Sequence, residues 1–179
     1  FLQDRVDMSL DSEFFPGPEP GLLGQMQAFM LSLLTTDQAP EEALEKAFSA
    51  LTERLLPDQA ALVRLTENMA DPLVALGEDE LIIPQQILEA VTDQRRILLY
   101  GDIDRQINLG QGNENIQRNI KSVLAGPLIF EGQVLGACLF ARDAAGFFSQ
   151  EKARMLDIAT PFLSALLARV LRQKPKTLG

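Results

Sequence analysis

The stretch "SVLAGPLIFEGQVLGACLFARDAAGFFSQEKARML", residues 122–156, predicts two strands joined by a tight turn, then a loop and a long helix. Two runs rich in aliphatic residues flank the turn "EGQ", and Gly132 suits a turn position with positive φ. Both runs are almost continuously apolar, which is typical of central strands covered on both faces. Ser149 and Glu151 suit the start of the helix that follows.

Helical periodicity surrounds this hairpin on both sides. Residues 21–36 have apolar residues at spacings of three and four and no charge, and residues 37–57 form a second amphipathic pattern. Two short strands, a helix, a third strand and a polar loop at 104–120 follow, and the closing helix contains Pro161, which should kink it. The order predicts an α+β, layered fold with a central, mostly antiparallel sheet flanked by helices and with long terminal helices.

The chain divides into three parts. Residues 1–20 are predicted to be a linker, because prolines and glycines gather at its end. Residues 21–172 are predicted to form a single domain, and residues 173–179 a basic tail. The first residue is Phe1, so we expect the chain to be a piece of a longer protein.

Composition excludes several classes of function. The formal net charge of -9 disfavours nucleic acid and anionic membrane surfaces as partners, and no apolar run is long enough to span a membrane. Cys138 is the single cysteine, which rules out an intramolecular disulfide and favours a cytoplasmic location. The absence of histidine excludes His-dependent triads and His-ligated haem, and we expect neither a metal nor a cofactor.

The hairpin and the helix after it resemble a GAF domain, a sensory and dimerisation module of signalling proteins. The resemblance covers roughly residues 38–172. It rests on the order and spacing of these residues: Ser122, Val123, Leu124, Pro127, Leu128, Gly132, Val134, Gly136, Leu139, Arg142, Phe148, Ser149 and Glu151. It implies a regulatory segment of a larger, cytoplasmic bacterial signalling protein that controls an attached output domain.

The resemblance also narrows the classes of ligand and of activity that we expect for this chain. Relatives that bind cyclic nucleotides carry an Asn-Lys…Phe…Asp-Glu signature, whereas this chain has Ala141-Arg142, Phe147 or Phe148, and Gln150-Glu151. Bilin-binding and haem-binding relatives use His, and methionine-sulfoxide-reducing relatives use several cysteines. We therefore expect no enzyme activity; the alternative of Asp102, Asp104 and Glu114 as acid–base groups is less favoured than a solvated loop.

In the family, a small-molecule pocket lies between the sheet and the segment that here spans residues 103–121. The resemblance predicts that an effector would contact Tyr100, Asp102, Ile107, Asn113, Ile116, Asn119, Ser122, Leu124 and Cys138. The alternative is that these residues are core or solvent-facing and that the pocket is collapsed.

The uncharged first helix and the doubled apolar stripe of the last one predict a homodimer through the terminal helices. The expected interface residues are Leu22, Met26, Phe29, Met30, Leu33, Phe162, Leu166 and Val170. Effector binding would then shift the arrangement of these helices and bias the output domain. A second interpretation, a structural dimerisation module without an effector, stays open.

Overall fold

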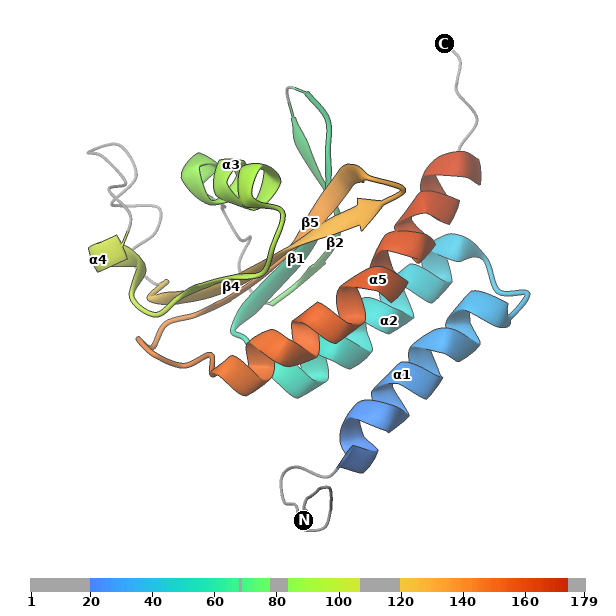
Figure 1. Cartoon of the computed structure of the whole chain (residues 1–179), viewed down its shortest axis with the longest axis horizontal. Helices are drawn as coiled ribbons and strands as arrows, with labels where there is room; N and C mark the ends of the chain where they lie inside the picture. Colours follow the sequence, from blue (N-terminus) through green and yellow to red (C-terminus); the bar gives the residue numbers. More distant parts are fainter. Residues whose placement is uncertain (1–19, 68, 78–83, 107–119, 174–179) are drawn as a thin grey trace, which may run out of the picture.

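The computed structural model describes residues 20–67, 69–77, 84–106 and 120–173 (Figure 1). The elements, in chain order, are α1 (Pro20–Thr35), α2 (Pro40–Leu55), β1 (Gln59–Leu65), β2 (Ala70–Leu76), α3 (Gln85–Gln94), β3 (Leu98–Tyr100), α4 (Ile103–Gln106), β4 (Ser122–Phe130), β5 (Gln133–Arg142) and α5 (Gln150–Gln173). Most of the polar loop predicted at 104–120 lies outside the described residues.

The predicted antiparallel sheet is confirmed. Its five strands lie in the order β2-β1-β5-β4-β3, and every neighbouring pair is antiparallel. The central pair is the predicted hairpin of β4 and β5. Its turn residues Glu131 and Gly132 both have positive φ, 52° and 81°, as the twist of a tight hairpin favours.

Helices cover the two faces of the sheet unequally (Figure 1). α1, α2 and α5 lie on one face, and α3 lies on the other. The strands separate their side chains accordingly: Leu124, Leu128 and Phe140 join the core beneath the three helices, where the Phe140 ring stacks on Phe48 at 5.4 Å between centroids. Alternate residues, including Val123 and Leu139, join the core beneath α3.

The apolar stripes of α1 and α5 pack within one chain. Five residues predicted to contact a second copy are buried here: Met26, Met30, Leu33, Leu166 and Val170. They belong to one core cluster with α2, because α1 lies against both α2 and α5 (Figure 1). That assignment to the dimer interface is therefore wrong for these five. Phe29 is 41% exposed and Phe162 is half-buried, while the side chain of Leu22 lies outside the described residues.

α5 runs without interruption through Pro161. A proline removes the amide donor that would otherwise reach the carbonyl of Asp157. The hydroxyl of Thr160 donates to that carbonyl oxygen at 3.1 Å, so a side chain replaces the missing backbone donor. Within the part of the chain that the structure describes, no helix combines the length and apolarity that a membrane crossing requires.

Replacing Thr160 with valine is expected to lower the free energy of unfolding by about 1 to 2 kcal/mol. Thr160 is buried, and valine keeps its shape but leaves the Asp157 carbonyl without a donor. Urea unfolding measures the difference. Thr160→Ser keeps the hydroxyl and should lose less stability than Thr160→Val; equal losses would show that the hydroxyl contributes nothing.

Candidate ligand-binding site

The sheet face beneath α3 is built from small side chains. Ala61, Ala125 and Ala137 are all buried there, and α3 packs onto them through Ile87 and Val91, which are both fully buried. Small residues on a sheet let a covering helix come close. The described part of this face is consequently filled by α3.

Three residues of the predicted site lie near the ends of β3 and β4. Tyr100 packs into the core beneath α3, and partial burial raises the pKa of its hydroxyl while nearby Arg96 lowers it. Asp102 begins α4, where its carboxylate accepts from the amide of Asp104 at 3.2 Å. The hydroxyl of Ser122 is buried and donates to the carbonyl of Ala144 at 2.8 Å. This hydroxyl therefore has a structural role within the domain.

The other predicted residues do not join them. Leu124 and Cys138 point into the opposite core, beneath α1, α2 and α5, so they line no common cavity with Tyr100. Burial raises the pKa of the Cys138 thiol, which keeps it protonated. Four further candidates lie outside the described residues: Ile107, Asn113, Ile116 and Asn119.

The residues that face α3 in place of Leu124 and Cys138 leave one partial signal in the sequence. Along β4 and β5, alanines occupy positions of one parity, at Ala125, Ala137 and Ala141, whereas Leu124 and Phe140 occupy the other. Side chains alternate between the faces of a strand, so the alanines mark the face beneath α3, although Val123 and Leu139 share that face and the small Cys138 lies on the other.

The positions of the cyclic-nucleotide signature have a structural role here. The Arg142 guanidinium and the Lys152 ammonium lie 4.2 and 4.0 Å from the centroid of the Phe147 ring. Lys152 Nζ also donates to the carbonyl of Leu55 at 2.9 Å, and Arg142 pairs with Asp58 at 3.4 Å. These contacts join the end of α2 to β5 and α5.

Burial, with the charge of Arg142, lowers the pKa of Lys152. A depressed lysine pKa means that the folded state binds fewer protons than the unfolded state as the ammonium titrates. The free energy of unfolding therefore rises as pH rises through the folded pKa of Lys152, and the penalty is fully present below that pKa.

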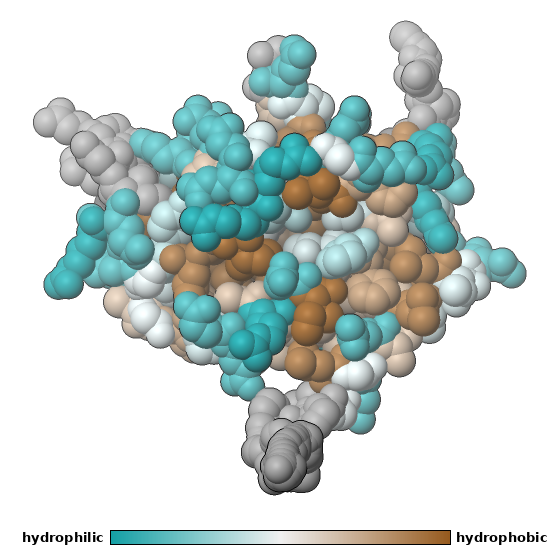
Figure 2. Space-filling view, viewed as in Figure 1, coloured by the Kyte–Doolittle hydropathy of each residue, from teal (hydrophilic) through white to brown (hydrophobic). Residues whose placement is uncertain are grey.

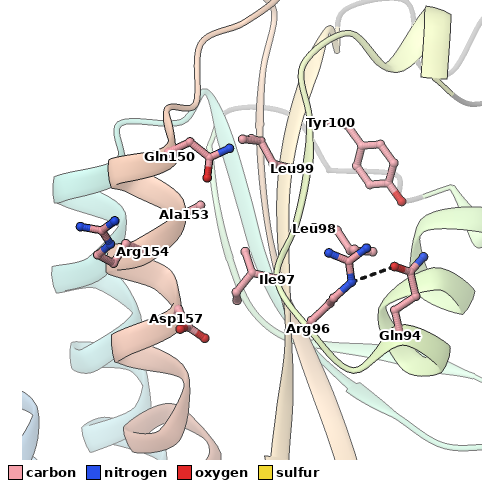
Figure 3. Close-up of a pocket in the computed structure, with 10 residues that line it drawn as sticks. All are labelled: Gln94, Arg96, Ile97, Leu98, Leu99, Tyr100, Gln150, Ala153, Arg154 and Asp157. Atoms are coloured by element: carbon pink, nitrogen blue, oxygen red, sulfur yellow. Dashed lines mark hydrogen bonds between the residues drawn. The ribbon is translucent and has the colours of Figure 1, made fainter.

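Two of the surface grooves in the described part of the chain adjoin the sheet. One, of about 700 Å³, runs between β3 and the first turns of α5 and is lined by residues that include Ile97, Leu99, Tyr100, Ala153 and Asp157 (Figure 3). The other, of about 510 Å³, lies between α3 and the turn joining β1 to β2. Among the described residues, no group of His, Cys, Asp or Glu side chains is placed to hold a metal ion.

Solved structures with this arrangement of helices and sheet are numerous, although neither a family model nor a curated protein matches the sequence. The GAF domain of an Acinetobacter phosphoenolpyruvate-protein phosphotransferase superposes with a TM-score of 0.69 at 12% identity, over 89% of this chain and 100% of that one. The chain has the GAF fold. A phycocyanobilin-bound GAF domain from a cyanobacterial phytochrome gives 0.68 at 9% identity, over 85% and 97% of the two chains.

A third neighbour corrects the expectation about catalysis. Free methionine-R-sulfoxide reductase from Neisseria meningitidis, solved with its substrate, superposes with a TM-score of 0.67 at 12% identity, over 89% of this chain and 96% of that one. An enzyme thus shares the fold, so the fold does not exclude catalysis, and the prediction of no enzyme activity is corrected on that point. Catalysis in this chain would need groups other than the buried, protonated Cys138.

Proposed function

We propose that this chain is a regulatory domain of a larger bacterial signalling protein, that it dimerises through the outer face of α1, and that a small effector biases an attached output domain. The GAF fold supports the regulatory part of the proposal. The observation that carries the dimer is the composition of α1, which has no charged residue although the whole chain has a formal net charge of -9.

The outer face of α1 fits a second helix. Its centre is formed by small or uncharged exposed residues, among them Gly24, Ala28 and Ser32. Larger exposed side chains flank this centre on both sides: Phe29 is 41% exposed and Leu31 is 54% exposed. Figure 2 shows brown and pale residues at the lower right of the molecule, where Figure 1 places α1. Small residues let helix axes approach closely, and two acidic chains meet most easily where neither is charged.

The buried face of α1 connects this interface to the domain core. Arg169 of α5 donates to the carbonyl of Leu34 at 2.6 Å, at the end of α1. α5 in turn packs on β4 through its buried residues. An effector that moved the sheet or α5 would therefore change the position of α1 and of any output domain attached to the terminal helices.

Replacing Leu31 with glutamate tests the dimer. We expect the unchanged protein to sediment as a dimer at micromolar concentration, and Leu31→Glu to weaken dimerisation by at least about 100-fold, because two like charges would then face each other. Sedimentation equilibrium gives the dissociation constant, and circular dichroism checks that the variant is folded.

Met69→Glu is the matched control. Met69 is 60% exposed and lies in the turn after β1, away from α1, so this variant should remain a dimer. An unchanged protein that is monomeric at micromolar concentration, or a Leu31→Glu variant that dimerises as before, would contradict the interface. Effector binding is tested separately by native mass spectrometry, in which mass above that of the polypeptide and lost on denaturation supports an effector.

A further inference from the structure

The two edges of the sheet differ in their capacity to accept another strand. β2 carries Pro72, which is exposed and has no amide donor, and a register shift opposite β2 disturbs β1. β3 contains no proline. No other described element hydrogen-bonds to the outer edge of β3 between Ile97 and Tyr100, although the carbonyl of Gly101 accepts from the amide of Gly146 at 2.7 Å.

The groove beside β3 has two chemically different sides (Figure 3). Ile97 and Leu99 point toward α5 and Ala153 and give that side apolar contacts, and Gln150, Arg154 and Asp157 of α5 add polar side chains to the same side. Arg96 lies on the other side with Tyr100, and it is exposed, with one hydrogen bond from its Nε to Gln94 at 3.1 Å. The groove also lies beside the first turns of α5, where the helix dipole favours negative charge.

Residues 5–11 of this chain, which lie outside the described residues, match both sides. Their sequence is "RVDMSLD", in which Val6, Met8 and Leu10 alternate with Asp7, Ser9 and Asp11. This alternation is the pattern of a strand with one apolar and one polar face. Residues 1–19 contain five acidic residues and one basic residue, which complements Arg96.

We propose that residues 5–11 of this chain pair with the outer edge of β3 as an added strand. The apolar side chains pack on Ile97, Leu99 and Ala153, and Asp7 or Asp11 meets Arg96. Main-chain hydrogen bonds supply affinity in such strand addition, and alternate side chains supply specificity. Because β3 has three residues, the walls of the groove are needed to hold the added strand.

The connection between residues 5–11 and α1 is the eight residues from 12 to 19. α1 and α5 run in the same direction, and the Arg169–Leu34 hydrogen bond aligns their C-terminal halves (Figure 1). Pro20 therefore lies toward the N-terminal part of α5, the part that forms a wall of the groove. The eight residues from 12 to 19 reach about 26 Å when extended. Docking of the segment would cover the free edge and exclude other strands from it.

Hydrogen–deuterium exchange of the full chain, read by mass spectrometry, tests the proposal. We expect residues 5–11 and 97–100 to exchange at least about 10-fold more slowly than an unstructured chain. The reason is that a docked strand must open locally before its amides can exchange. Arg96→Glu should remove most of this protection. Adding Asp7→Lys and Asp11→Lys to Arg96→Glu should restore it, because the charges are then reversed on both sides.

Lys46→Glu is the control for charge alone, since Lys46 is exposed on α2. It should leave the protection of residues 5–11 unchanged. The proposal is overturned if residues 5–11 exchange at the rate of an unstructured chain, or if Arg96→Glu leaves their protection intact. Protection that grows with protein concentration would assign the strand to a second copy, which also overturns docking within one chain.

Discussion

Replacing Gly136 with alanine is expected to lower the free energy of unfolding by about 3 kcal/mol. A Cβ atom at this position would overlap the backbone oxygen of Val63 and would lie 3.0 Å from a methyl carbon of Leu167. The first contact is with the neighbouring strand β1, which cannot turn aside as a side chain can. β1 and β5 must therefore separate locally, or α5 must move away from the sheet.

Thermal and urea unfolding measure this effect, and the loss corresponds to a fall in melting temperature of about 6 to 12 °C for a domain of this size. Gly101→Ala is the matched control. A Cβ atom there meets nothing closer than the Gln106 side-chain oxygen at 3.9 Å, so the change should stay within about 0.5 kcal/mol. If Gly136→Ala were as stable as Gly101→Ala, the close approach of β1 to β5 would be incorrect.

The role of Gly136 shows what the sequence could and could not establish. A glycine within an apolar strand indicated a close approach by a ligand, by a backbone, or by neither. In the structure, the group that closely approaches Gly136 is the backbone of Val63. That contact depends on the pairing of β1 with β5, two strands separated by residues 66–132, and no local pattern contains it.

The hairpin was predictable for the opposite reason. Turn chemistry at Gly132 and the two apolar runs are local, so the sequence alone located β4 and β5. Which face each residue occupies was harder, because nearly continuous apolar runs hide the alternation. Leu124 and Cys138 were consequently assigned to the wrong side of the sheet relative to Tyr100.

Several residues predicted for the dimer interface were misassigned because of a related ambiguity. An uncharged helix can be buried in its own domain or against a partner, and its periodicity is the same in both cases. The two faces of α1 differ in burial. Met26, Met30 and Leu33 are buried against the domain, whereas Phe29 and Leu31 are exposed. The sequence located the helix, and the packing of α1 on α2 and α5 decided which face remains free.

The difference between buried and exposed positions leads to the second large expected effect, which is on the free energy of unfolding. Replacing Leu166 with glutamate is expected to lower the free energy of unfolding by at least about 4 kcal/mol, because it removes a core side chain and buries a carboxyl group without a partner. Leu166 is 0% exposed and shares a core cluster with Met30 and Leu51. A loss of this size is a large part of the stability of a typical domain, so a substantial unfolded fraction is expected.

The pH dependence of the free energy of unfolding separates the loss of the leucine side chain from the burial of the carboxyl group. Burial would raise the pKa of Glu at position 166 in the folded state, so the folded state would bind more protons than the unfolded one. Stability should therefore fall as pH rises from about 5 to 7 and recover on acidification. The isosteric control Leu166→Gln, which cannot titrate, should be destabilised with little dependence on pH in that range.

Leu31→Glu completes the comparison, because it introduces the same group on the same helical layer at a side chain that is 54% exposed. It should leave the unfolding of the monomer nearly unchanged while weakening the dimer. If Leu166→Glu instead yielded a folded monomer with unchanged stability, Leu166 would lie at a subunit contact and α1 would not pack on α5 as described. Because position 166 on α5 is buried and position 31 on α1 is exposed, unfolding by one glutamate and dissociation by the other would establish which face of the α1–α5 layer belongs to the core and which to a second chain.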